Sequence, residues 1–198
     1  MPYTVASPTL ALKFARAGCD YVLNKKGMQG ANWDQYTSAV HSWESCIGRF
    51  GPSKCKPKKD KIDICVYDVV RPKVRKLTGG ATDFKYIKTI ADVAQKNGCG
   101  NCGEFSAVAF MYLYKKGVRP LDWMQLTDAD HAFLVIGRAS GNENDLDSWG
   151  RFAAVCDPWG QGFTGKADQG TYPGTKFKKK MSQLLTFKGV DSIYRAYA

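Results

Sequence analysis

Residues 102–117 read CGEFSAVAFMYLYKKG, and this stretch decides the fold. Its side chains are apolar on nearly every face until Lys115, and Gly117 and Pro120 mark its end. A helix that is apolar all round lies in the centre of a domain rather than on its surface. The sequence therefore predicts a buried central helix that begins at Cys102.

The pattern changes from helix to strand after this stretch. Strand-like segments follow as WMQLT at 123–127, HAFLVIGR at 131–138 and RFAAVCDPWG at 151–160. Residues 181–198 mix a short helix signal with apolar residues of a strand. Helices followed by strands along the chain are typical of an α+β fold, which is the class we expect.

The residues before the central helix are mostly helical in pattern. Ser7 and Pro8 form a cap and first-turn pair for a helix that ends near Asn24. Apolar residues at helical spacing predict a second helix over 32–47 and a third over 83–97. Residues 62–77 fit either a strand or a helix broken at Pro72, and the pattern does not decide between them.

Length and composition limit the class of protein. The chain has 198 residues, of which 44% are hydrophobic and 24% are charged, values typical of a globular domain rather than a disordered or collagen-like chain. It contains no apolar run long enough to span a membrane. We expect a helical N-terminal part, 1–80, that packs on a core formed by 81–198 without being an independent domain. The first 18 residues do not resemble a secretory signal.

The net charge of +11 is concentrated in two stretches. Residues 51–76 hold nine Lys and Arg against three Asp, and residues 174–188 hold five Lys and no acid. Such stretches are either solvated surface or binding sites for acidic proteins, anionic lipid or nucleic acid. Aromatic residues do not interleave with the lysines as a nucleic-acid stacking surface requires, so we expect no nucleic-acid partner. We expect these charges to lie apart from the chemistry of residues 99–160.

Seven cysteines leave at least one unpaired within the chain. Cys99 and Cys102 have C-x-x-C spacing, and a second pair that would complete a zinc site is missing. The chain has two histidines, of which His41 lies off the apolar stripe of its predicted helix and is expected at the surface. No metal or other cofactor is therefore expected.

Three residues on successive elements form a candidate catalytic set: Cys102, His131 and Asp157. The N–H groups and dipole of a helix start favour the thiolate form of a cysteine placed there. His131 opens the strand that follows an acidic turn, and Asp157 ends the next strand. A thiolate, an imidazole that moves its proton and a carboxylate that orients the imidazole are the parts of a cysteine acyl-transfer site.

These residues also carry a resemblance to a known family. GNCGEFSAVAFMYLYKKGVRP at 100–120, HAFLVIG at 131–137 and the strand ending DPWG at 157–160 resemble the core of the transglutaminase-like, papain-like superfamily. The resemblance covers about 95–160, and implies a Cys-bearing central helix packed on an antiparallel sheet, with a Cys-His-Asp triad. The 26-residue step from His131 to Asp157 is longer than in many members.

The resemblance implies attack of Cys102 on an amide carbonyl, with the oxyanion held by the Cys102 backbone N–H and a second donor. Gln95, Asn97 and Asn101 are the candidates for that donor. Trp159 is a candidate wall of the site, whereas Trp123 is expected mainly in the core.

The expected function is thioester-forming acyl transfer on protein amides, as in a glutamine or asparagine deamidase or a transglutaminase. A papain-like protease is the alternative. The small core with a distinct helical N-terminal part resembles bacterial effectors and toxins, so we expect a secreted or injected protein that acts in the cytoplasm of its target cell on a protein substrate, with an acidic inhibitor or immunity protein as a partner.

A second alternative is a redox or binding module that uses Cys99-x-x-Cys102. A thioredoxin-like motif needs a preceding strand, whereas a helix precedes this one, and the module gives His131 and Asp157 no role. Under oxidation, the C-x-x-C spacing predicts a Cys99–Cys102 bond that silences the enzyme.

Overall fold

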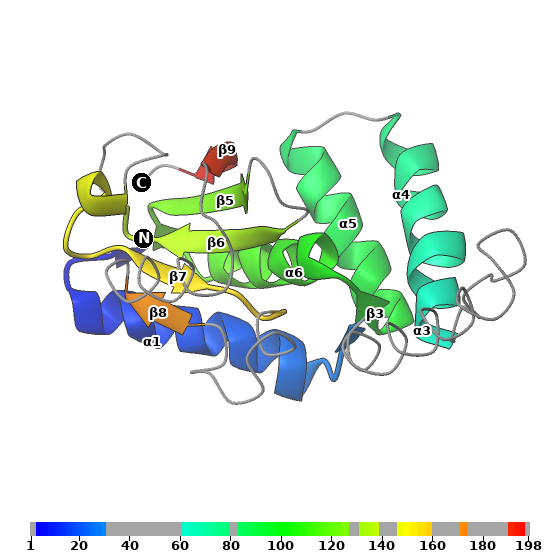
Figure 1. Ribbon diagram of the computed structural model, residues 1–198, viewed down its shortest axis with the longest axis horizontal. Helices are drawn as coiled ribbons and strands as arrows, with labels where there is room; N and C mark the ends of the chain where they lie inside the picture. Colours follow the sequence, from blue (N-terminus) through cyan, green and yellow to red (C-terminus); the bar gives the residue numbers. More distant parts are fainter. Residues whose placement is uncertain are drawn as a thin grey trace, which may run out of the picture.

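An antiparallel sheet with strand order β8-β7-β6-β5-β9 forms one layer of the molecule (Figure 1). The computed structural model describes residues 3–30, 61–79, 83–126, 131–138, 146–159, 171–173 and 190–196. All five residues of the central strand β6 are buried, so both of its faces are covered, which explains its unbroken apolar run. The strands are β5 (Leu121–Leu126), β6 (Ala132–Ile136), β7 (Ala154–Cys156), β8 (Thr171–Pro173) and β9 (Val190–Ala196).

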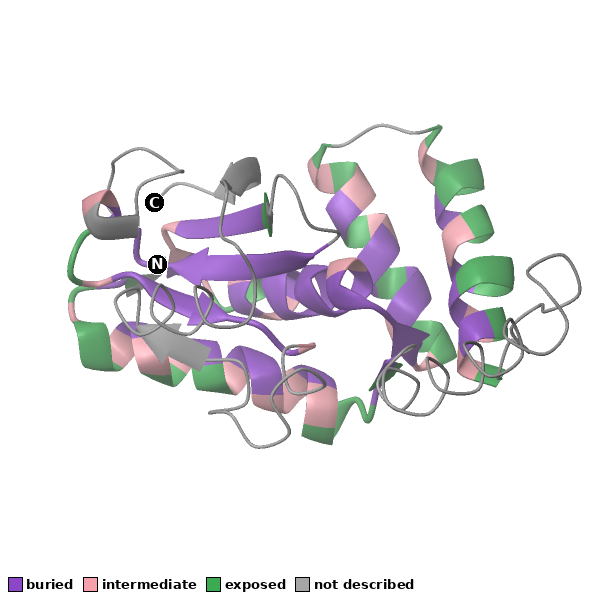
Figure 2. Cartoon of the chain, viewed as in Figure 1, coloured by how far each residue is buried: buried purple, intermediate pink, exposed green. Residues whose placement is uncertain are grey.

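The central helix α6 (Cys102–Lys115) packs against β5 and β6, as its apolar sequence predicts. Figure 2 shows the helix buried along nearly its whole length. Phe105, Phe110 and Leu113 are fully buried on it, and together with strand residues they form the centre of the hydrophobic core. The observed bounds of α6 confirm that Cys102 is its first residue.

Helix α1 (Pro8–Asp20) lies beside α6 and packs against β7 and β8 (Figure 1). The hydroxyl of Ser7 accepts a hydrogen bond from the backbone N–H of Leu10 over 3.1 Å, which confirms the predicted cap. The helix continues into the π-helical turn η1 (Tyr21–Lys25). The N-terminal helix is therefore part of the same core as the sheet.

Two further helices extend from the opposite side of α6 (Figure 1). Helix α5 (Phe84–Asn97) is capped by Asp83 and ends at Gly98, whose positive φ of 69° suits glycine, as predicted. The undecided segment 62–77 is helical and contacts α5, with Val66, Val70 and Val74 buried. Pro72 lies where the π-helical turn passes directly into the α-helix, and the helical conformation continues through it. This segment comprises α3 (Lys61–Asp63), the π-helical η2 (Ile64–Val70) and α4 (Arg71–Thr78).

Short parallel pairings fasten the ends of these elements together. Strand β1 (Tyr3–Thr4) pairs with β4 (Val118–Arg119), and β2 (Gln29–Gly30) pairs with β3 (Cys99–Gly100). The second pairing holds the chain just before Cys102. The 3-10 turn η3 (Leu146–Trp149) precedes β7.

The α+β class predicted from the sequence is confirmed by this arrangement. The predicted helix over 32–47, including His41, lies outside the described residues, as does the predicted helix signal at 181–189. Within the part of the chain that the structure describes, no helix has the length and apolarity needed to cross a membrane.

Candidate active site

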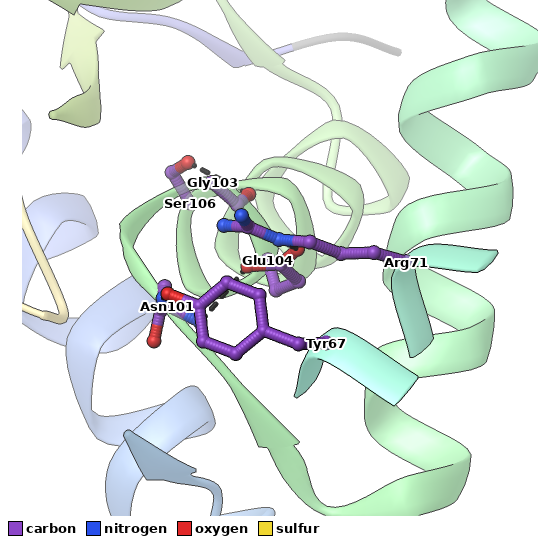
Figure 3. A network of polar contacts seen from close by, with 6 residues as sticks. All are labelled: Tyr67, Arg71, Asn101, Gly103, Glu104 and Ser106. Carbon is purple, nitrogen blue, oxygen red and sulfur yellow. Dashed lines mark hydrogen bonds and ion pairs between the residues drawn. The ribbon is translucent and has the colours of Figure 1, made fainter. Parts of the chain in front are cut away.

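Cys102 occupies the first position of α6, and a polar network fixes that helix start. The backbone N–H of Asn101, the N-cap, donates to Oε2 of Glu104 over 2.9 Å. Arg71 from α4 donates from Nε to the other oxygen, Oε1, over 3.1 Å. Figure 3 shows Arg71 reaching across the first turn of α6, with Tyr67 beside Asn101. Glu104 thus joins the helix that carries the thiol to the helix opposite it.

A second set of contacts holds the same turn from the side of the sheet. The indole Nε1–H of Trp123, on β5, donates to the hydroxyl of Ser106 over 2.7 Å. That hydroxyl donates to the carbonyl of Gly103 over 3.0 Å (Figure 3). The first turn of α6 is therefore anchored from both sides, which gives the Cys102 side chain a defined position.

His131 and Asp157 form a buried pair at one end of the sheet. His131 directly precedes β6 and Asp157 directly follows β7, and these strands are antiparallel neighbours with Leu134 opposite Cys156. The pairing brings the two side chains together, and the Nε2–H of His131 donates to Oδ2 of Asp157 over 2.7 Å. The two side chains are only 6% and 8% exposed, so little water competes for this contact.

The environment of His131 favours its protonated form. Burial lowers the pKa of His131, but the charge and hydrogen bond of Asp157 and those of Cys102 outweigh burial and raise that pKa to about 10. The contribution of Cys102 shows that the thiol and the imidazole lie within interaction range. Because Nε2 faces Asp157, Nδ1 is the ring nitrogen suited to exchange a proton with the thiol.

Two aromatic rings lie near this imidazole. The ring centroid of Trp159 lies 5.7 Å from that of His131, and that of Phe133 lies at 6.1 Å. Trp159 thus contacts His131 but does not line the cavity beside it, which Trp123 does. Packing against two rings restricts the imidazole to the orientation that the carboxylate requires.

Cys102 and His131 line a common cavity of about 440 Å³. This volume lies in the range of pockets that hold a small molecule or a side chain. Asp157 stands behind His131 and does not line it. The other described residues that line the cavity come from α4, α5, the start of α6, and strands β5 and β6: Arg71, Val74, Arg75, Thr78, Tyr86, Ile90, Gly103, Glu104, Trp123, Gln125 and Ala132.

The expected separation of charge from chemistry does not hold for Arg71 and Arg75, whereas residues 51–60 of the first basic stretch lie outside the described residues. Arg71 and Arg75 belong to this basic stretch, and both line the cavity with Cys102. The helical form of 61–78, which the sequence left undecided, brings them there. The second basic stretch, 174–188, lies outside the described residues.

The three predicted oxyanion donors are bound elsewhere and do not line the cavity. Gln95 accepts a hydrogen bond from the Tyr21 hydroxyl over 3.2 Å, and the amide of Asn97 donates to the carbonyl of Val93 over 2.7 Å. The amide of Asn101 donates to the Tyr67 hydroxyl over 3.0 Å. These contacts assign the three side chains to packing and capping, which corrects the prediction.

Backbone N–H groups at the start of α6 are better placed to hold an oxyanion. Cys102 and Gly103 both line the cavity and belong to the first turn of α6. The helix dipole adds to their attraction for negative charge.

The cysteines that the structure describes divide into a disulfide, a buried pair and the cavity thiol. Cys65 is bonded to Cys99, so the expected disulfide between Cys99 and Cys102 is wrong. The redox alternative requires Cys99 and Cys102 to pair with each other, and Cys99 already has another partner. Cys19 and Cys156 are fully buried with their sulfur atoms 3.7 Å apart. Burial, followed by the contact with Cys156, raises the pKa of Cys19, which makes it a poor nucleophile.

Sequence reasoning missed Arg71, Arg75 and Glu104. The Asn101-x-x-Glu104 spacing is that of a capping box and could have identified Glu104 as the residue that orders the helix start. The two arginines carry no such signal until 71–78 is known to be helical.

The assembled groups can attack an acyl carbon, move a proton and stabilise an oxyanion at one cavity. The thiol comes from a helix start, the imidazole and carboxylate from adjacent strands, and the N–H groups from the first turn of α6. No family model, curated protein or solved structure that was compared with this chain matches it.

Proposed function

We propose that this chain is a thiol acyl-transfer enzyme with Cys102 as nucleophile, His131 as proton carrier and Asp157 as the group that orients His131. The observation that carries the proposal is the buried 2.7 Å pair of His131 and Asp157, whose imidazole shares a cavity with Cys102. The arrangement supports a papain-like or transglutaminase-like core, as the sequence resemblance implies.

In the first half-reaction the thiolate of Cys102 attacks the carbonyl carbon of an amide. A C–S bond forms, and the carbonyl oxygen takes the negative charge beside the N–H groups of Cys102 and Gly103. The C–N bond then breaks, and His131 gives its proton to the leaving nitrogen. The products are a thioester on Cys102 and a free amine, or ammonia when the substrate is a side-chain amide.

In the second half-reaction an acceptor replaces the thiolate. Water, or a primary amine, attacks the thioester carbon while His131 takes its proton, and the C–S bond breaks to regenerate the thiolate. Water acting on a glutamine or asparagine side chain gives deamidation, whereas an amine gives a cross-link. Asp157 holds the imidazole in position throughout and stabilises its charged form.

A side-chain amide is the favoured substrate. The cavity of about 440 Å³ suits the entry of one side chain, whereas a protease requires a groove for an extended backbone. We therefore propose a glutamine or asparagine deamidase or a transglutaminase acting on a protein, with a papain-like protease as the second candidate.

The disulfide Cys65–Cys99 supports an exported protein, since such bonds persist in oxidising compartments. This is consistent with an effector or toxin that is secreted or injected and then acts in the cytoplasm of a target cell. An acidic inhibitor or immunity protein is the partner that the basic residues at the cavity suggest.

Selective alkylation tests the proposal without knowledge of the substrate. Iodoacetamide should label Cys102 of the wild type faster than an unfolded thiol, because His131 takes the proton of the thiol in the proposed chemistry, and peptide mapping identifies the site. In His131→Ala the alkylation of Cys102 should slow to the rate of an unfolded thiol. Asp157→Ala should retain part of the faster rate because an orienting group contributes less. Equal labelling of wild type and His131→Ala would overturn the proposed chemistry.

Intact-mass analysis of candidate protein substrates then separates the reactions. Deamidation adds about one dalton, a cross-link joins two chains, and proteolysis yields fragments. Cys102→Ala, which lacks the nucleophile, is the control and should leave every substrate unchanged.

A further inference from the structure

One face of α4 forms a wall of the cavity. Arg71, Val74, Arg75 and Thr78 all line it, and their spacing of three, four and seven residues from Arg71 is that of a single helical face. Val74 is buried at the base of this face, whereas Arg75 is exposed. The wall therefore presents a cation toward the solvent side of the site.

The two arginines on this wall differ in their partners. Arg71 is bound to Glu104 over 3.1 Å and lies 4.8 Å from the ring centroid of Tyr67. Among the described residues, Arg75 forms no ion pair, and Glu104 is the only acidic residue that lines the cavity. The positive charge of Arg75 is thus not neutralised by the described part of the site.

The position of Arg75 relative to Cys102 sets what it can bind. Arg71 contacts Glu104, two residues after Cys102, so this end of α4 lies near the thiol. Arg75 follows four residues later, about 6 Å further along the helix axis. A substrate whose amide is at Cys102 therefore extends past Arg75 within one or two residues of the attacked side chain.

We propose that Arg75 is a specificity-determining residue that binds the carboxylate of an acidic side chain next to the attacked glutamine or asparagine. This inference rests on the proposed thiol chemistry and adds the substrate class, an amide within an acidic segment. A guanidinium suits this role because it pairs with both oxygens of a carboxylate and keeps its charge at all working pH values.

Two alkylating reagents that differ in one charge test the proposal. The iodoacetyl derivatives of glutamate α-amide and glutamine α-amide have almost the same shape, and both deliver their reactive carbon to Cys102. The rate ratio of the anionic to the neutral reagent is measured by peptide mass for wild type, Arg75→Gln and Lys76→Gln. Lys76 is the matched control because it is an exposed cation on α4 that does not line the cavity.

The wild type should favour the anionic reagent by about threefold to fivefold, as an exposed ion pair allows, and the preference should decrease with added salt. Arg75→Gln should bring the ratio close to that of free cysteine, whereas Lys76→Gln should retain it. A ratio that is equal in wild type and Arg75→Gln would overturn the subsite.

A third reagent, iodoacetyl-glutamine with a free α-carboxylate, distinguishes side-chain from chain-end carboxylates. A stronger preference for it than for the glutamate derivative would overturn the assignment to an acidic side chain. The same rates distinguish failure of the Arg75 proposal from failure of the proposed thiol chemistry. Fast, His131-dependent labelling by the neutral reagent without any charge preference removes only the subsite, whereas slow labelling of Cys102 by all three reagents removes both proposals.

Discussion

The charge state of His131 makes the stability of the protein depend on pH. Burial lowers the pKa of His131, but the carboxylate of Asp157 outweighs burial. The pKa therefore rises from the ordinary value of 6.5 to about 10 in the folded protein. A raised pKa means that folding favours the protonated form. The resulting stabilisation is fully present below pH 6.5 and is lost as pH rises through about 10.

Asp157→Asn should remove most of this dependence. We expect the difference in the free energy of unfolding between wild type and Asp157→Asn to be largest near pH 6 and to shrink steadily toward pH 10. Urea unfolding at a series of pH values measures it. A difference that is constant with pH, or that grows toward pH 10, would contradict a protonated His131 in the folded protein.

Residue types and their order gave Cys102, His131 and Asp157 as candidates, and the structure pairs His131 with Asp157 and places Cys102 and His131 at one cavity. These candidates follow from local signals, because a helix start and two strand ends can be read from the sequence. The candidates for the second oxyanion donor do not line that cavity. Gln95, Asn97 and Asn101 were chosen for proximity along the chain, and the structure gives each a different hydrogen-bond partner. Side chains with amides satisfy nearby backbone or hydroxyl groups, and such contacts cannot be read from spacing alone.

At the scale of elements, the turn between β3 and α6 depends on a glycine. A Cβ added at Gly100 would overlap the Cβ of Glu104, whereas one added at Gly103 would meet nothing within 4 Å. Gly100→Ala should therefore displace Glu104 and lower both the stability and the rate of Cys102 alkylation. Gly103→Ala should raise stability by up to about 1 kcal/mol, because alanine favours helix.

Thermal unfolding and iodoacetamide kinetics on the two variants check this pair. The two substitutions add the same methyl group three residues apart, so a difference between them reports the local geometry. Similar behaviour of both would show that the helix start tolerates displacement of Glu104.

The disulfide joins η2 to the β3 segment just before α6. Its two cysteines are 34 residues apart in sequence, and closing a loop of that length in the unfolded chain stabilises the fold by about 4 kcal/mol. We expect Cys65→Ser/Cys99→Ser to lose about that much in urea unfolding. The double variant should still alkylate at Cys102 in a His131-dependent manner, because Cys99 takes no part in the chemistry.

The fully reduced wild type is the control and should match the double variant in stability. Loss of Cys102 reactivity in the double variant, with the fold retained, would instead restore a redox role to Cys99.

Periodicity predicted the bounds of α5 and α6 closely but did not reveal how elements pair. Segment 62–77 was ambiguous because short apolar runs fit either period, and packing against α5 decides in favour of helix. Strand β9 follows a segment with mixed signals, and its pairing with β5 joins residues about 70 positions apart. Long-range pairings of this kind are set by the whole fold and leave little trace in local sequence.

At the scale of the whole molecule, α1 packs the N-terminal residues against the five-stranded sheet. Gly18 lies against β7 and α6, and a Cβ there would come within 2.8 Å of the Cys156 sulfur and 3.2 Å of Leu113. Gly18→Val should therefore destabilise the entire protein by about 1–3 kcal/mol through overpacking. Arg16→Val, on the exposed face of the same helix, should cost well under 1 kcal/mol.

Urea unfolding followed by both tryptophan fluorescence and circular dichroism measures this pair. Coincident transitions from the two signals are expected, because α1 and the sheet share one core. Separate transitions, or an unaffected Gly18→Val, would mean that the N-terminal helix is dispensable.

The position of the α4 wall also bears on how such a protein can change over evolutionary time. Cys102, His131 and Asp157 are buried, in a part of the protein where most substitutions are costly, whereas Arg75 lies on an exposed helical face. If the proposed roles hold, mutations on that face would alter which substrates are accepted at little cost in stability. A lineage carrying this fold would then adapt to a changing target by substitutions on one short helix while the proposed chemistry stayed constant.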